Sequence, residues 1–209
     1  MRAVAAGASI ARFGDGEFKM IYGAGYVREP PNLRLSTELF ETLKAEAPGL
    51  LIAIPTMDPA GPKFASWDRH RERFVRIVPE DATFYSAFVT RPDSAPWILT
   101  AEYLALVESV WAGRRVAIVC HGSNKLLQVV RATARSTVHI GCPFERAYSG
   151  IGRLEREVAG AGVDVAVLSV GPTATCLARR LHARGIQALD FGSAGGFLAK
   201  LRGRQCSPS

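Results

Sequence analysis

The sequence predicts a single-domain, Rossmann-like α/β fold in which a largely parallel sheet is covered by helices. Apolar runs of strand-forming residues alternate with segments whose apolar residues recur at helical spacing. This alternation is typical of parallel sheets, since a helix carries the chain back to the start of the next strand. With 209 residues and 48% hydrophobic content, the chain can bury one good core. We therefore expect one domain over residues 1–209, with a frayed tail at 203–209.

The first half of the chain is the less regular part. Ser36 can cap a helix that continues to Lys44, because its hydroxyl can accept hydrogen bonds from N–H groups of the first turn. The apolar run at 50–55 indicates a buried strand, and the prolines and glycines at 57–63 favour a loop. The remaining segments are expected to form a partly helical stretch (67–78), a strand rich in β-forming residues (83–89) and a turn (90–93).

The second half alternates more regularly. Apolar residues in the segment 96–111 recur at the helical period, and the segment 115–120 is an almost unbroken apolar run typical of a buried strand. The predicted order is helix 96–111, strand 115–120, helix 123–135, strand 137–140, helix 151–159, strand 163–170, helix 173–183 and strand 187–191.

The charge balance narrows the classes of partner. The chain has 26 basic and 19 acidic residues, a formal net charge of +7. A positive field favours an anionic substrate, such as a nucleotide diphosphate or a polyprenyl-phosphate-linked acceptor. Nucleic acid would also fit, but no aromatic or glycine-rich nucleic-acid motif accompanies the arginine cluster at 69–76, so we expect no nucleic-acid partner. The other interpretation is that the charges are scattered over solvated faces.

Several other classes of protein are disfavoured. No apolar run is long enough to cross a membrane, and residues 1–7 are too short for a signal peptide's apolar region. We therefore expect a cytoplasmic protein, with peripheral membrane contact left open. The sequence has no serine-hydrolase elbow, Walker A motif or dinucleotide glycine motif. The cysteines form no C-x-x-C pair and are expected to be reduced thiols rather than zinc ligands: Cys120, Cys142, Cys176 and Cys206.

The most informative segment is residues 12–17, which read R-F-G-D-G-E. On an extended backbone, Asp15 and Glu17 would project to the same side, and Gly16 would let another group approach the backbone. Two carboxylates at one point suit Mg²⁺ or Mn²⁺ that also binds a diphosphate. Arg12 adds a planar donor fork for phosphate oxygens. The alternative is a polar turn with solvated acids.

Three blocks together resemble the GT-D-type glycosyltransferases. Residues 9–21 resemble the opening of that family, where an R-F-G-D-G-E segment carries an acidic D-x-E motif. Residues 168–178 are similar to the family's strand, G-P-T-A turn and following helix, and residues 185–192 are similar to its G-Y-Q-A-I-D-I-G block. The blocks occur in the family's order and span nearly the whole chain.

The resemblance implies metal-assisted transfer of a sugar from a nucleotide diphosphate donor, a UDP-sugar above all, to a glycan or lipid-linked acceptor. It implies that Asp15 and Glu17 hold the donor diphosphate through Mn²⁺ or Mg²⁺ and act in catalysis. The candidate substrate-binding residues are Arg12, Gly14, Gly16, Arg91, Gly171, Pro172, Thr173 and Asp190.

Three predicted strand ends carry candidate ligand loops, because ligands in open α/β sheets bind beyond the carboxyl ends of the strands. His121 is either a general base for the acceptor hydroxyl or a polar turn residue. Thr173 either donates its hydroxyl to a phosphate at a helix N-terminus or is an ordinary first-turn residue. Asp190 either holds a ribose hydroxyl or caps a turn.

The chain departs from the family pattern at two places. Residues 119–122 read V-C-H-G where relatives often end a strand in E-G, and residues 192–197 are small where relatives often have a G-H segment. The second departure motivates the competing hypothesis of a non-catalytic module that binds a nucleotide-sugar or polyanion with the same fold.

Overall fold

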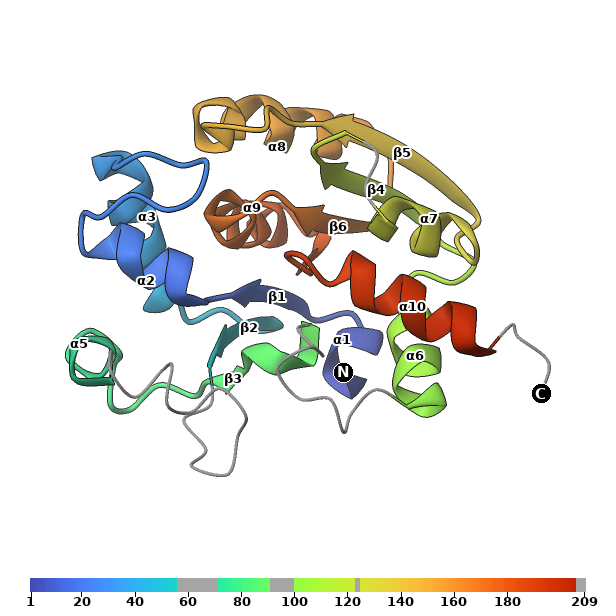
Figure 1. The fold of residues 1–209 in the computed structure, drawn as a ribbon, viewed down its shortest axis with the longest axis horizontal. Coiled ribbons are helices and arrows are strands. Elements are labelled where there is room, and N and C mark those ends of the chain that lie inside the picture. Colours follow the sequence, from blue (N-terminus) through green and yellow to red (C-terminus); the bar gives the residue numbers. More distant parts are fainter. Residues whose placement is uncertain (56–70, 91–99, 123–124, 206–209) are drawn as a thin grey trace.

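The computed structural model describes residues 1–55, 71–90, 100–122 and 125–205, and its centre is a seven-stranded, all-parallel sheet. The strand order is β3-β2-β1-β7-β6-β4-β5 (Figure 1). The strands are β1 (Ser9–Arg12), β2 (Leu50–Ile54), β3 (Tyr85–Ser86), β4 (Arg115–Cys120), β5 (Ser136–Gly141), β6 (Val165–Ser169) and β7 (Gln187–Asp190).

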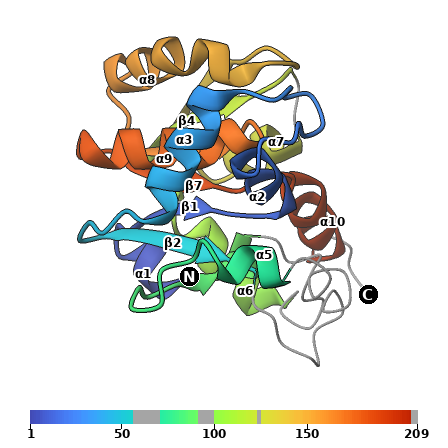
Figure 2. The ribbon, with the colours of Figure 1, turned by 90° about the vertical axis from the view of Figure 1, so that its left-hand side faces the viewer.

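Helices cover both faces of the sheet, which gives three layers (Figures 1 and 2). One face carries α2 (Asp15–Ile21), α3 (Leu33–Leu43), α8 (Ile151–Gly160) and α9 (Pro172–Ala183), and α5 (Arg71–Val75) adds Phe74 to the same core. The other face carries α1 (Arg2–Ala5), α6 (Ala101–Glu108), α7 (Lys125–Arg131) and α10 (Gly195–Gln205). The described residues also include two short 3₁₀ segments, η1 (Ala87–Thr90) and η4 (Ala147–Gly150).

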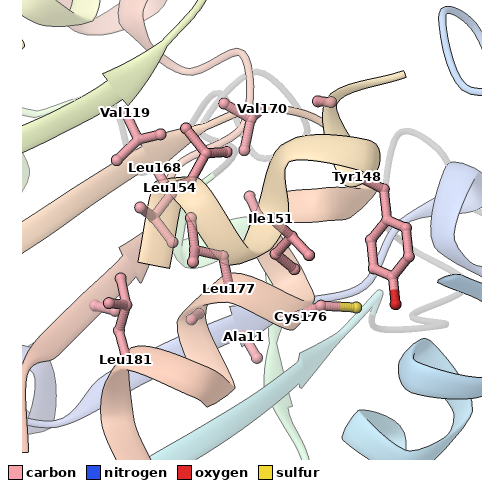
Figure 3. Close-up of a cluster of buried hydrophobic side chains, with 14 of the residues drawn as sticks. Ala11, Val119, Tyr148, Ile151, Leu154, Leu168, Val170, Cys176, Leu177 and Leu181 are labelled. Carbon is pink, nitrogen blue, oxygen red and sulfur yellow. The ribbon is translucent and has the colours of Figure 1, made fainter. Parts of the chain in front are cut away.

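The central strands are apolar throughout because both of their faces are buried. Along β6, Leu168 packs toward the α8 and α9 side, whereas its neighbour Val167 packs toward the opposite helix layer. Figure 3 shows the first of these cores, where Leu154 of α8 and Leu177 of α9 lie over the sheet. The α/β fold and the parallel sheet predicted from the alternation of elements are thus confirmed. Within the described ranges, no helix combines the length and hydropathy required to span a membrane.

Two predicted elements of the first half are corrected by the structure. Asn32, not Ser36, caps α3, since its side-chain oxygen accepts hydrogen bonds from the N–H groups of Arg34 and Leu35. Ser36 lies inside the helix and donates its hydroxyl to the carbonyl of Ile21. The predicted strand 83–89 is reduced to the two residues of β3, because the chain turns into η1 at Ala87.

The N-terminal D-G-E motif and the C-terminal tail also differ from expectation. The D-G-E segment is not extended: α2 begins at Asp15, with Gly14 as its N-cap. Residues 203–205 of the expected frayed tail belong to α10. The predicted loop 57–63 and parts of the predicted segments 67–78, 90–93, 96–111 and 123–135 lie outside the described residues, as does Cys206.

Candidate functional site

A cavity of about 380 Å³ lies at the carboxyl edge of the sheet, where ligands of open α/β folds bind. Each of the seven strands contributes lining residues from its carboxyl end or the segment just beyond it. The volume is in the range of small-molecule sites. The lining includes these residues expected from the sequence: Arg12, Gly14, Asp15, Glu17, His121, Gly171 and Pro172.

Three expected residues do not line this cavity among the described side chains: Gly16, Thr173 and Asp190. Arg91 lies outside the described residues.

Arg12 ends β1 and extends along the floor of the cavity with only 8% of its surface exposed. Its Nε lies 3.8 Å from Asp190 Oδ1 and has no hydrogen-bond partner among the described residues. The guanidinium lies against Gly192, where a Cβ atom would be 2.5 Å from Nη2, and close to Gly14. Arg12 thus lines the cavity as a largely buried cation, while its unpartnered Nε is buried near Asp190.

Gly192 is required by both space and backbone conformation. Its φ of +48° is in the left-handed region, which costs a non-glycine residue about 1–2 kcal/mol. We expect Gly192→Ala to lower the melting temperature and to weaken ligand binding, because the new methyl group must displace Arg12.

Gly196→Ala is the matched control in α10, since a Cβ there meets no atom within 4 Å. The melting temperatures of Gly192→Ala and Gly196→Ala, measured with and without UDP, would check this expectation. Equal melting temperatures and equal UDP shifts for both variants would contradict the expectation.

Glu17, in the first turn of α2, is 4% exposed. One carboxylate oxygen accepts a hydrogen bond from the N–H of Gly14 at 2.7 Å. Burial raises the pKa of Glu17 to about 7, with the Arg12 guanidinium acting against this rise and the Asp190 carboxylate adding to it. Glu17 can therefore hold or release a proton near neutral pH. A bound cation would favour its ionised form.

Asp15 and Glu17 reach the same cavity for a different reason from the one expected. On a helix, residues i and i+2 do not face each other, so the expectation that an extended backbone aims them at one point is wrong. The Asp15 side chain is 46% exposed and pairs with Lys19, whose Nζ lies 3.1 Å from Oδ2. Both carboxylates line the cavity because it surrounds the N-terminus of α2. The group that approaches Gly16 is the protein's own Tyr26 ring, 2.8 Å from an added Cβ.

Asp190 and Thr173 lie beneath the site. Asp190 Oδ1 accepts the N–H of Gly192 at 3.0 Å, which is the turn-capping role. Its other oxygen lies 3.2 Å from the hydroxyl of Thr175. Burial raises the pKa of Asp190, and the Arg12 guanidinium opposes the rise. The hydroxyl of Thr173 is fully buried and has no hydrogen-bond partner among the described residues.

His121, just beyond β4, also lines the cavity, and its ring packs against an aromatic side chain. Its Nδ1 lies 3.3 Å from the carbonyl of Cys142, which favours a proton on Nδ1 and leaves Nε2 as the acceptor of the neutral ring. The His121 ring packs 4.7 Å from Phe144, centroid to centroid. The guanidinium of Arg28 lies over the same Phe144 ring at 3.6 Å.

Sequence reasoning missed this Arg28–Phe144 pair. Arg28 and Arg146 both have left-handed backbones, with φ of 70° and 53°, and the N–H of Arg146 donates to the carbonyl of Arg28 at 2.8 Å. A left-handed backbone at glycine can be expected from the sequence, whereas at arginine it cannot. The loops that contain Arg28 and Arg146 are also far apart in the chain. Strained non-glycine residues persist where surrounding structure determines them, often beside ligand sites.

Comparison with known proteins identifies relatives among glycosyltransferases. A family model of the glycosyltransferase GT-D fold matches residues 10–195. The chain is 28% identical over 199 residues to glycosyltransferase GlyD of Streptococcus pneumoniae serotype 4, and 29% identical over 204 residues to the probable glycosyl transferase Gly of Streptococcus gordonii. These matches cover 88% and 89% of this chain but 24% and 29% of those proteins, so the chain spans about a quarter of the length of the curated relatives it matches.

Solved structures agree on the fold. A glycosyltransferase from Streptococcus sanguinis matches with a TM-score of 0.77 at 27% identity, over 89% of this chain and 75% of that one. The domain of unknown function 1792, described as having a distinct glycosyltransferase fold, matches with a TM-score of 0.81 at 24% identity, over 93% and 76%. The region matched by the family model contains all the described lining residues of the cavity, and the chain belongs to the family of glycosyltransferases with the GT-D fold.

Proposed function

We propose that the protein transfers a sugar from a nucleotide diphosphate donor, a UDP-sugar, to a hydroxyl group of a glycan or lipid-linked acceptor. The observation that carries this proposal is the largely buried Arg12 guanidinium, which lines one cavity with the buried Glu17. A planar cation fits diphosphate oxygens. Gly171 and Pro172 begin α9 at the same cavity, so the positive end of that helix dipole also faces an anionic ligand.

A divalent cation would bind here only together with the diphosphate of the donor. Among the described residues there is no cluster of three or more His, Cys, Asp or Glu side chains suited to hold a metal ion by itself. Mg²⁺ and ions like it are commonly bound by one or two carboxylates together with substrate phosphates and water. Asp15 and Glu17 would be those carboxylates. The ion would neutralise charge on the departing diphosphate.

In the transfer step, the anomeric carbon of the sugar loses its bond to a diphosphate oxygen and gains a bond to the acceptor oxygen. Residues of this chain would act on both of these oxygens. The proton of the acceptor hydroxyl passes to a base. His121 Nε2 is the proposed base, since Nδ1 is oriented by the Cys142 carbonyl. Arg12 would hold the leaving diphosphate.

Calorimetry with UDP, with and without Mn²⁺, tests the donor assignment. We expect UDP to bind and Mn²⁺ to strengthen the binding, because the ion shields the diphosphate from Glu17 and Asp15. A panel of UDP-sugars then tests turnover. Absence of UDP affinity with either Mn²⁺ or Mg²⁺ would refute the assignment. Binding without transfer or donor hydrolysis would favour the non-catalytic module, and salt-sensitive affinity for DNA would favour a nucleic-acid partner.

We expect His121→Ala to lower the rate of transfer to the acceptor while leaving UDP affinity unchanged, because Arg12 and Glu17 still hold the nucleotide. His139→Ala is the matched control, since His139 is an exposed residue of β5 that does not line the cavity. Transfer rates and UDP affinities of both variants are measured on the same preparations. Unchanged transfer in His121→Ala would make it a structural turn residue, and lost UDP affinity would move it to the nucleotide side.

A further inference from the structure

A second cavity, of about 370 Å³, lies beside the first and shares Pro55 with it. It is formed between α2, the end of β2 and α5, which lies next to α2 in both views (Figures 1 and 2). The rings of Phe18 and Phe74 stack in its wall with centroids 4.0 Å apart. Among its described lining residues only Glu80 is charged. The remaining lining residues are Ile54, Val75, Val78, Pro79, Ala82 and Phe84.

Consecutive residues of α2 line the two cavities. Glu17 lines the cavity of the candidate site, and Phe18 lines the apolar one. A ligand that passes Pro55 would therefore have one end among carboxylates and Arg12, and the other end among aromatic and aliphatic side chains. This arrangement fits an amphiphilic molecule rather than a uniformly polar glycan.

The surface next to the apolar cavity has the same mixed character. Val75 lines the cavity and is nevertheless 59% exposed. Arg73 and Arg76, one on each side of Val75 in the sequence near the end of α5, are both exposed.

We propose that the apolar cavity binds the aliphatic chain of a lipid-linked acceptor, whose hydroxyl-bearing end lies in the cavity of the candidate site. This assignment rests on the proposed glycosyltransferase function. The walls offer apolar contact along the chain, and each methylene group buried from water strengthens binding about fourfold. The acceptor would thus be selected by its lipid portion as well as by its reacting hydroxyl.

Alkyl glucosides of different chain length test the assignment directly. Calorimetry compares octyl β-glucoside, below its micellar concentration, with methyl β-glucoside. We expect the wild-type protein to bind the octyl compound at least about tenfold more tightly, as burial of two or more methylene groups requires. Equal affinity for the two compounds would overturn the proposal.

Two variants and one control locate the binding. Val78→Asn makes the cavity wall polar, and Ala82→Phe fills the cavity, so both should abolish the preference for the octyl compound while UDP affinity is retained. Val138→Asn is the same change on exposed β5, at the opposite edge of the sheet, and should retain the preference. Melting temperatures identify a variant that does not fold. An unchanged preference in folded Val78→Asn or Ala82→Phe would overturn the proposal.

The readouts separate this proposal from the donor assignment. If UDP fails to bind wild-type protein but the octyl preference still depends on Val78 and Ala82, the donor assignment is wrong and the apolar site stands. If UDP binds and the preference is absent, only the lipid assignment is wrong. Tighter binding of N-acetyl-leucine amide than of octyl β-glucoside would assign the cavity to a peptide acceptor and overturn the lipid one.

Discussion

Replacing Glu17 with glutamine should reduce sugar transfer by roughly a hundredfold or more, and it should also stabilise the ligand-free protein above neutral pH. The loss of transfer follows because the amide keeps the size of the side chain but removes the negative charge that would hold the cation and diphosphate. The hydrogen bond from Gly14 survives, since the amide oxygen can accept it. The fold should therefore remain intact.

The pH dependence of this stabilisation has a definite sign. The pKa of Glu17 is raised by burial from 4.5 in the unfolded chain to about 7 in the folded protein. Between these two values the folded state holds a proton that the unfolded state has lost, so stability falls as pH rises toward 7. The full cost of ionising the buried group, on the order of 3 kcal/mol, applies above that range. Glu17→Gln removes this cost.

Thermal unfolding at pH 5 and pH 8, together with transfer assays, checks the prediction. The difference in melting temperature between Glu17→Gln and wild type should be larger at pH 8. Asp15→Asn is the matched comparison: it should also lose transfer, but its exposed carboxylate should give no comparable stabilisation. Wild-type turnover in both amide variants would show that the carboxylates do not hold the diphosphate.

Replacing Arg12 with methionine should abolish measurable UDP binding and destabilise the fold by about 3–5 kcal/mol. Methionine keeps most of the apolar volume, but its loss of charge leaves Asp190 buried without the guanidinium 3.8 Å away. It also removes the cation that opposes the raised pKa values of Glu17 and Asp190. Both effects act on the ligand-free protein.

A double variant separates stability from binding. Adding Asp190→Asn to Arg12→Met removes the unpaired buried charge and keeps an acceptor for the N–H of Gly192. The double variant should recover part of the lost stability, measured by urea unfolding, but none of the UDP affinity, measured by calorimetry. Recovery of UDP binding along with stability would mean that Arg12 serves only to neutralise Asp190.

Much of the fold follows from local patterns. The strands β4 and β6 and the helices α8 and α9 are apolar at the right periods, so their bounds agree with the sequence within a few residues. The N-terminal motif is different: its D-G-E segment reads equally well as an extended chain or as the first turn of a helix. Two contacts favour the helix: the side chain of Glu17 caps it by accepting a hydrogen bond from the N–H of Gly14, and Gly16 packs against the Tyr26 ring.

The candidate site is predictable only in part, because the sequence shows where strands end but not how deeply a side chain is buried or which distant loops meet. Carboxyl ends of parallel strands meet at one edge, so the sequence predicts that the loops at His121, Gly171 and Asp190 lie together. His121 and Gly171 line the cavity, whereas Asp190 does not and only Gly192 and Ser193 of its loop do. Burial depth is not readable from a motif, so the sequence alone does not decide whether Asp190 holds a ribose hydroxyl or caps a turn. The Arg28–Phe144 wall joins loops more than a hundred residues apart and has no local signature.

The sheet order has a consequence for biosynthesis. Among the described strands, β1 comes first in the sequence and pairs with β7, which comes last, and the Arg12 guanidinium lies against Gly192. A chain still emerging from the ribosome thus contains Arg12 early but lacks the turn against which its guanidinium packs until residue 192 is released. Closing so long a loop is slow and late in folding. The candidate site should therefore form only after translation of this region.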